Sequence, residues 1–155
     1  SLVTAGVALS CVQVAGVIGR VSWGVIADRL RSSTAVLIMI GSTMALASLI
    51  ASQIGAAWPQ IVVFVFFFVF GLVAVGWNGV FASEAARISP PGAIGHVTGG
   101  VLFVTFSGVL FGPVVFSMLY QVTGSYSATF FASACLAAIG VACLGVSRRA
   151  ARADQ

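Results

Sequence analysis

Long apolar segments without charge alternate with three short charged ones along this chain. No Asp, Glu, Lys or Arg occurs in residues 2–19, 32–83 or 88–147. A helix needs about 20 apolar residues to cross the hydrocarbon of a bilayer. The first uncharged segment is therefore long enough for one membrane-spanning helix, and each of the other two is long enough for two.

Helix-breaking residues divide these segments further. The third segment opens on the loop ISPPGAIG (88–95), because a double proline cannot continue a helix. Within QIGAAWPQ (53–60), Pro59 suits the first turn of a new helix. The Gly, Ser and Tyr residues of YQVTGSYS (120–127) indicate a turn at the membrane surface. The pattern predicts five transmembrane helices, at about residues 2–27, 34–52, 59–83, 95–119 and 127–146.

Composition indicates an all-α integral membrane protein. Hydrophobic residues make up 60% of the chain and charged residues only 6%, with a mean hydropathy of +1.15. Soluble domains carry about 25% charged residues. Cys11, Cys135 and Cys143 lie within apolar segments, far from any pair of histidines. We therefore expect neither a metal site nor a cofactor.

The placement of charge predicts an orientation. Two predicted helices separate the charged group at 20–31 from that at 84–87, and two more separate the latter from 148–155, so all three lie on one side. They contain all seven arginines, and the positive-inside rule makes this side cytoplasmic. The first residue is then outside and the last is inside. This odd number of spans indicates the C-terminal part of a longer protein. Arginine without lysine favours a bacterial inner membrane, and topology explains the basic residues without a nucleic-acid partner.

The stretch GRVSWGVIADRLR (19–31) holds more charge than orientation requires. Arg20, Gly24 and Asp28 recur every four residues and so form one stripe on a helix. Gly24 would let a neighbouring helix approach between the two charges. Orientation alone accounts for Arg29 but not for Asp28.

Glu84 and Arg87 end the third predicted helix on the same side. Being three residues apart on a helix, they can pair with each other, and they can also pair with a neighbour. Exposed ion pairs contribute only about 0–1 kcal/mol each, so such contacts suit a gate that opens and closes. We expect a breakable network of Arg20, Asp28 and Arg29 with Glu84 and Arg87.

These residues resemble motifs of the major facilitator superfamily of transporters. Gly24, Asp28 and Arg29 match the front half of its loop signature between the eighth and ninth helices, whose second glycine is replaced by Arg31 or shifted. GWNGVFASEAAR (76–87) resembles the end of the tenth helix, where a glutamate and an arginine are typical partners of that signature. GPVVFSMLYQVTGSYSATF resembles the eleventh helix leading into the twelfth. The resemblance covers residues 1–155 as helices eight to twelve of a 12-helix fold.

The resemblance implies secondary active transport of a small solute by alternating access. It implies two rocking six-helix halves, with the Asp28 network latching the cytoplasmic side. The expected partners are the bilayer, the solute and the missing N-terminal half. A non-transporting receptor or assembly subunit on the same fold remains the alternative. An enzyme is not expected, because the chain has one histidine and no acid deep within its predicted spans.

The fourth predicted helix contains Gly99, Gly108, Gly112 and Pro113. Glycines let helix backbones approach closely in lipid, and a proline within a helix favours a bend. Their spacing resembles the antiporter motif of the same superfamily, but the closing glycine pair of that motif is absent. Symport, antiport and uniport therefore stay open.

Polar residues within the spans are the candidates for solute binding, because secondary transporters bind near the bilayer midplane. Asn78 beside Trp77 stands first, since an amide forms directional hydrogen bonds and an indole offers a stacking face. A hydrogen bond between helices is the equally weighted alternative. The other candidates are Gln13, Thr98, Thr105 and Ser107. A coupling proton or other ion would bind elsewhere in the protein, because these spans hold no deep acid.

Overall fold

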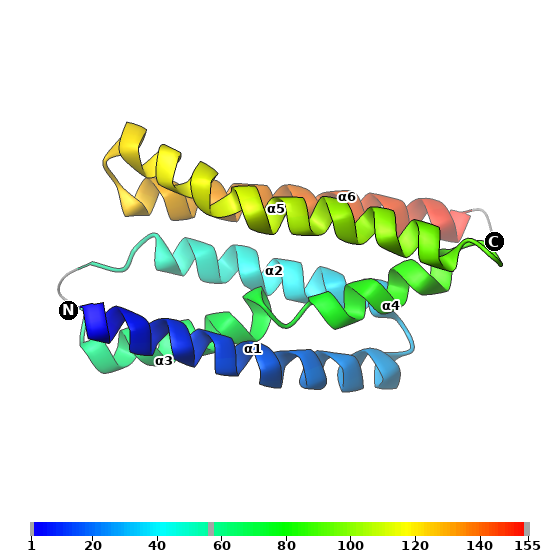
Figure 1. Cartoon of the computed structure of the whole chain (residues 1–155), viewed down its shortest axis with the longest axis horizontal. Coiled ribbons are helices and arrows are strands. Elements are labelled where there is room, and N and C mark those ends of the chain that lie inside the picture. The colour runs from blue at the N-terminus through cyan, green and yellow to red at the C-terminus, as the bar shows by residue number, and fades with distance from the viewer. Residues whose placement is uncertain (1, 56–57, 154–155) are drawn as a thin grey trace.

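Every regular element in the described part of the chain is a helix. The computed structural model describes residues 2–55 and 58–153. The elements are α1 (Leu2–Leu30), α2 (Ser33–Ala51), α3 (Gln60–Ala74), α4 (Asn78–Ile88), α5 (Ile94–Thr123) and α6 (Tyr126–Ala153), as shown in Figure 1.

Five segments are long and apolar enough to cross a membrane. They are Gly6–Leu30, Ser33–Ala51, Gln60–Ile88, Ile94–Thr123 and Tyr126–Arg149. Each overlaps one of the five segments expected from the hydropathy pattern. The prediction of an all-α chain with five helical segments able to span a membrane is confirmed.

Three helices run past their predicted ends into the charged residues. α1 continues to Leu30, α4 to Ile88 and α6 to Ala153, so Asp28 and Arg29 lie on a helix and not in a loop. Charge ends a membrane span without ending a helix, because arginine is a good helix former. The charged side chains are therefore held on a rigid element.

The turn between α5 and α6 is shorter than the predicted 120–127. α5 continues through Thr123, and only Gly124 and Ser125 lie outside a helix. Gly124 has a φ of 62°, and its N–H donates to the Tyr120 carbonyl oxygen at 2.8 Å. This left-handed cap needs glycine, so the helix ends there and the polar residues before it stay helical.

The third segment long enough to cross a membrane consists of two helices, so the prediction of a continuous helix over 59–83 is wrong. A turn at 75–77 separates α3 from α4. The indole N–H of Trp23 on α1 donates to the Leu72 carbonyl oxygen at 2.9 Å. An unbroken helix would pair this carbonyl with the amide of Gly76. The intruding indole thus takes a place in the hydrogen-bond ladder, a known cause of helix breaks.

α1 crosses α3 and the turn after it closely at four glycines, which we call the glycine seam: Gly16, Gly19, Gly71 and Gly76. A Cβ on Gly71 would lie 2.6 Å from the Val12 carbonyl oxygen, and one on Gly19 would overlap the Leu72 carbonyl oxygen. The two backbones touch here, so a side chain at these positions would force the helices apart.

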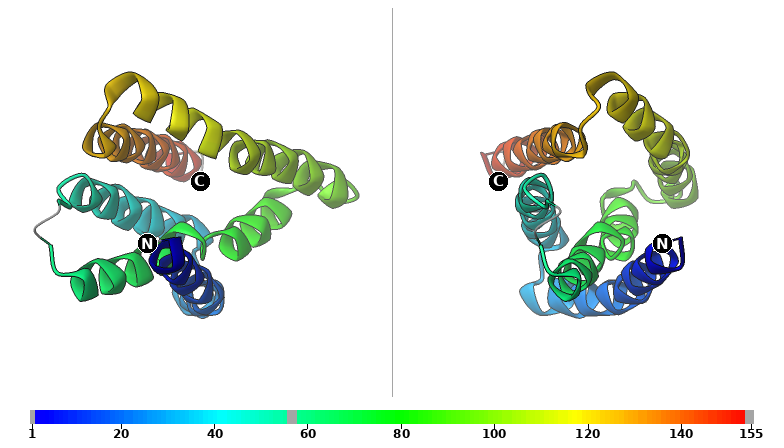
Figure 2. Two further views of the ribbon diagram at one scale, coloured as in Figure 1. Left: turned by 60° about the vertical axis from the view of Figure 1, so that its left-hand side comes forward. Right: turned by 90° about the vertical axis from the view of Figure 1, so that its left-hand side faces the viewer.

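The remaining helices pack on either side of α2. α2 runs along α6, and α5 contacts only α4 and α6 among the described elements. The views agree that α5 and α6 lie on one side and α1 and α3 on the other, with α2 between them (Figures 1 and 2). The axis of α5 changes direction along its length (Figure 2), and Pro113 lies inside this helix.

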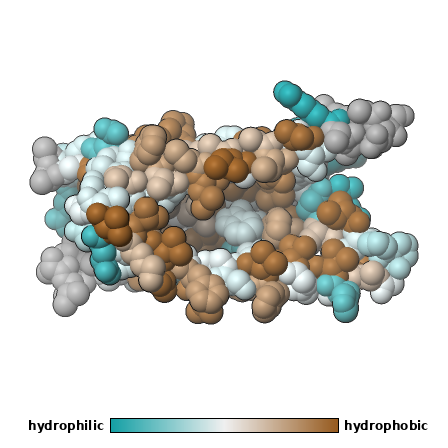
Figure 3. Space-filling view, turned by 90° about the horizontal axis from the view of Figure 1, so that it is seen from above, coloured by the Kyte–Doolittle hydropathy of each residue, from teal (hydrophilic) through white to brown (hydrophobic). Residues whose placement is uncertain are grey.

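The buried core is small and lies where the first four helices meet. It consists of Ala27, Val36, Leu37, Ile40, Val73 and Val80. α5 has no buried residue, and its large apolar side chains point outward. Figure 3 shows apolar residues along the middle of one face and hydrophilic residues toward its two ends. This distribution fits a surface covered by lipid.

The charged segments gather at one end of the bundle, as the sequence predicts. The turn between α1 and α2, the turn between α4 and α5 and the end of α6 lie together, opposite the start of α1 (Figure 1). The charged groups at 20–31, 84–87 and 148–155 lead into or include these parts of the chain. We call this region the charged end.

The glycines expected to bring helices together do not do so within the described residues. A Cβ added at Gly24, Gly99, Gly108 or Gly112 would meet no atom within 4 Å. The close approach occurs instead at the glycine seam. Sequence gives each glycine the same freedom, and only the arrangement of α1 against α3 decides which of them is needed.

Candidate functional site at the charged end and the broken span

Glu84 links two helices at the charged end. The Thr34 hydroxyl at the start of α2 donates to Glu84 Oε1 at 2.7 Å. From α4 itself, Arg87 Nε donates to Oε2 at 2.8 Å and Nη2 to Oε1 at 2.7 Å. Only 11% of the Glu84 side chain is exposed, against 67% for Arg87. The carboxylate is therefore bonded on both oxygens, and its arginine faces outward.

The structure forms one part of the expected charge network. Arg87–Glu84 is the sole ion pair among the described residues. Asp28, Arg31 and Arg87 line one cavity of about 350 Å³ together with Ser32, Ser33 and Thr34. Arg20 and Arg29 are exposed on α1 and do not line this cavity. Asp28 is thus brought near Arg87, while Arg20 and Arg29 point elsewhere.

Arg31 makes the turn between α1 and α2 with an unusual backbone. Its φ is 49°, in the left-handed region that favours glycine. Ser32 then caps α2, because its side-chain oxygen accepts from the Ala35 amide at 3.3 Å.

Trp77 and Asn78 lie at the break between α3 and α4. The Asn78 side-chain amide donates to the Val75 carbonyl oxygen at 3.3 Å and so satisfies a backbone group freed by the break. The Trp77 ring meets the Phe81 ring edge to face, with centroids 5.3 Å apart. Both residues are half-buried. The leading solute candidates therefore lie at the break within the candidate span Gln60–Ile88.

The other polar candidates are not gathered around this break by any hydrogen bond. Gln13 is exposed on α1, while Thr105 and Ser107 are partly exposed on α5. The Ser107 hydroxyl donates to the Phe103 carbonyl oxygen of its own helix at 2.8 Å. The Thr98 hydroxyl is buried and has no hydrogen-bond partner among the described residues.

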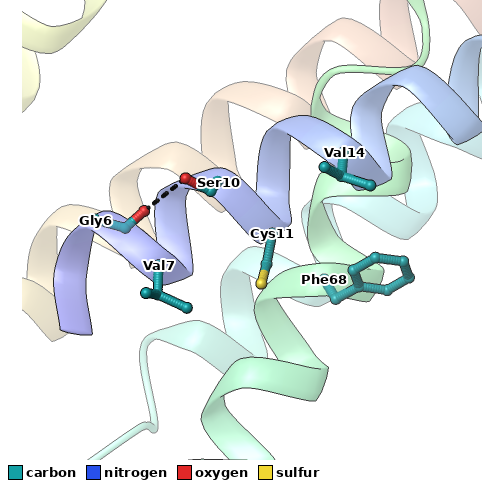
Figure 4. A pocket seen from close by; sticks show the side chains of 6 residues that line it. All are labelled: Gly6, Val7, Ser10, Cys11, Val14 and Phe68. Atoms are coloured by element: carbon teal, nitrogen blue, oxygen red, sulfur yellow. Dashed lines mark hydrogen bonds between the residues drawn. The ribbon is translucent and has the colours of Figure 1, made fainter. Parts of the chain in front are cut away.

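A mostly apolar pocket lies at the other end of α1. It has a volume of about 510 Å³, and Figure 4 shows its lining: Gly6, Val7, Ser10, Cys11, Val14 and Phe68. The Ser10 hydroxyl donates to the Gly6 carbonyl oxygen of its own helix at 2.9 Å (Figure 4). The pocket therefore presents no charged group and little free polarity to a ligand.

Two residues that sequence reasoning missed hold these sites together. Thr34 is the partner of Glu84, and Trp23 is the partner of the Leu72 carbonyl. Both contacts join residues about fifty positions apart, so no local sequence pattern predicts them. The available signal was weak: a threonine at a helix start and a tryptophan within the charged stretch 19–31.

No group of three or more His, Cys, Asp or Glu side chains in the described part of the chain is placed to hold a metal ion. Comparison with known proteins adds no assignment, because no family model, no curated protein and no solved structure matches the chain.

Proposed function

We propose that this chain is part of a secondary transporter of the major facilitator type, which moves a small solute across a bacterial inner membrane by alternating access. The observation that carries the proposal is the break within the span Gln60–Ile88, with Trp77 and Asn78 at it. Transporters typically build solute sites where a spanning helix is discontinuous, because the break offers polar groups at membrane depth.

The charged end gives this proposal a second support. Arg31 has the backbone conformation of a glycine at the position of the second signature glycine. Thr34 joins the start of α2 to Glu84 near the end of α4, a pair of elements that corresponds to helices nine and ten of the family. In this proposal the charged end is cytoplasmic, with the first residue outside and the last inside.

Asn78 and Trp77 have the leading roles toward the solute. The Asn78 amide would exchange its bond to the Val75 carbonyl for bonds to solute, and the Trp77 indole would stack on it. Asp28 is exposed on α1 and would latch to a helix of the other half when the cytoplasmic side closes. Gln13 and Thr105 would line the pathway.

The test is solute flux by the full-length protein in reconstituted vesicles, using a labelled panel of sugars, amino acids and organic ions. Asn78→Ala should lower uptake of the transported solute at least about tenfold, the equivalent of about 1.4 kcal/mol. Ser83→Ala is the matched control, because this exposed hydroxyl of α4 bonds only the Val80 carbonyl. Absence of flux for every solute by folded protein would favour the receptor or assembly subunit.

The latch has its own test. A cysteine introduced at Ser33, beside Asp28, should react faster with an impermeant maleimide from the cytoplasmic side in Asp28→Asn than in the parent protein. Native cysteines are first replaced, and Asp28→Glu serves as the control that keeps the charge. Equal labelling and equal uptake in both variants would contradict the latch, and labelling only from outside would contradict the orientation.

A further inference from the structure

A second cavity at the charged end lies beside the one that Asp28 lines. It has a volume of about 590 Å³ and lies between α2, α4, α5 and α6. Ligand pockets are typically about 300–1,000 Å³, so the cavity has the size of a binding site. Arginines from three separate parts of the chain line it: Arg31 after α1, Arg87 in α4 and Arg148 in α6.

Positive charge exceeds negative charge around this cavity. Glu84 is the one acid in its lining, and Asp28 lines the neighbouring cavity, which shares Arg31 and Arg87. Glu84 already accepts hydrogen bonds from Thr34 and Arg87 on both oxygens. Three guanidinium groups thus face two carboxylates. An anion with several acceptor oxygens is the complement of such a cluster, since arginine binds phosphate oxygens in a bidentate way.

Apart from the hydroxyls of Ser32, Thr34 and Ser147, the rest of the wall is apolar. Leu37 of α2, Val101 of α5 and Leu144 of α6 are among its apolar residues. A free phosphate ion gains nothing from these side chains, whereas an amphiphile lays its hydrocarbon against them. The cavity also lies at the polar end of a bundle whose flanks are apolar, which is the depth of lipid headgroups.

We propose that this cavity binds an anionic glycerophospholipid, with its phosphate on Arg31 and Arg148, beside the Arg87 that Glu84 already holds, and the start of an acyl chain along Val101 and Leu144. The bound lipid would bridge α2, α4, α5 and α6 at the charged end. It would thereby hold α5, which contacts only α4 and α6 within the described chain.

The test is native mass spectrometry of the full-length, delipidated protein with added phosphatidylglycerol or phosphatidylcholine. Phosphatidylglycerol should be retained in preference to phosphatidylcholine. The double variant Arg31→Gln with Arg148→Gln should lose at least about tenfold in affinity, because hydrogen bonds to charged groups contribute about 1.5–3 kcal/mol each. The matched control removes the exposed neighbours, Arg29→Gln with Arg149→Gln, and should change affinity less than about twofold.

A second variant tests the apolar wall without removing charge. Val101→Trp should fill the cavity and exclude the lipid, while thermal unfolding in detergent reports whether the bundle still folds. The proposal would be overturned if both double arginine variants lost the same affinity for phosphatidylglycerol. It would also be overturned if the parent protein retained phosphatidylglycerol and phosphatidylcholine equally. Displacement of the lipid by millimolar inorganic phosphate would show a free-anion site instead and would also overturn it.

Discussion

The Thr34 hydroxyl donates a 2.7 Å hydrogen bond to Glu84, a residue fifty positions further along the chain. This contact joins the first turn of α2 to the last turns of α4. It connects two candidate membrane spans at the end where the charged residues gather. The bond is the most direct evidence that the charged end is an assembled structure and not a set of separate anchors.

Replacing the Thr34 hydroxyl by a methyl group should destabilise the bundle. Thr34→Val keeps the shape but leaves Glu84 one donor short, which should cost about 1.5–3 kcal/mol. Thermal unfolding in detergent measures the loss. Thr43→Val is the matched control on α2, because the exposed Thr43 hydroxyl bonds only the Met39 carbonyl of its own helix. It should stay within about 0.5 kcal/mol of the parent, and equal losses would contradict the assignment.

The two partners of the ion pair should differ in the cost of their removal. Arg87→Gln leaves a Glu84 side chain that is only 11% exposed without its charge partner, which should cost about 1–3 kcal/mol. Glu84→Gln leaves a guanidinium that is 67% exposed, so the loss should be clearly smaller. Chemical unfolding of the two variants under the same conditions measures which of them loses more stability. A larger loss for Glu84→Gln would show that Arg87 and not Glu84 is the enclosed group.

A methyl group should be tolerated at one glycine of α1 and not at another. Gly19→Ala places a Cβ on the Leu72 carbonyl oxygen. It should lower the free energy of unfolding by at least about 3 kcal/mol, the upper end of the typical cost of overpacking. Gly24→Ala meets open space and should stabilise α1 by about 0.5–1 kcal/mol. Unfolding midpoints measured under one set of conditions give the comparison. Equal effects would contradict the close crossing of α1 and α3.

Because the turn at Arg31 is strained, substitution by glycine should change stability in opposite directions at two nearby arginines, Arg31 and Arg29. Arg31→Gly should stabilise the protein by about 0.5–1 kcal/mol, because glycine adopts a φ of 49° without penalty. Arg29→Gly lies within α1 and should destabilise by about 0.5–1 kcal/mol. The two variants lose the same charge, so a change in net charge affects both equally. Chemical unfolding measures their stability, and a lower stability of both variants would show that the turn does not need a glycine conformation.

Sequence alone predicts the elements of this fold well and their contacts poorly. Hydropathy identifies five spans because lipid exposure imposes one composition on every residue of a span. The break at 75–77 is different, since the Leu72 carbonyl beside it is bonded by the Trp23 indole of another helix. No property of the segment 59–83 itself encodes that contact.

In the candidate site, too, one feature follows from the local sequence and another depends on contacts between helices. The pairing of Glu84 with Arg87 follows from helical spacing and is found in the structure. The approach of a helix at Gly24 is not found, because the neighbouring α3 crosses α1 earlier, at Gly16 and Gly19. Where two helices cross depends on side chains of both, and a pattern read along one helix leaves it undetermined.

The hydrogen bond from Trp23 to the Leu72 carbonyl also makes the shape of one helix depend on the presence of another. In hydrocarbon an unbonded carbonyl costs several kcal/mol, so the break within Gln60–Ile88 becomes more costly when the indole is absent. We therefore expect a chain that lacks α1 to favour an unbroken helix over this segment.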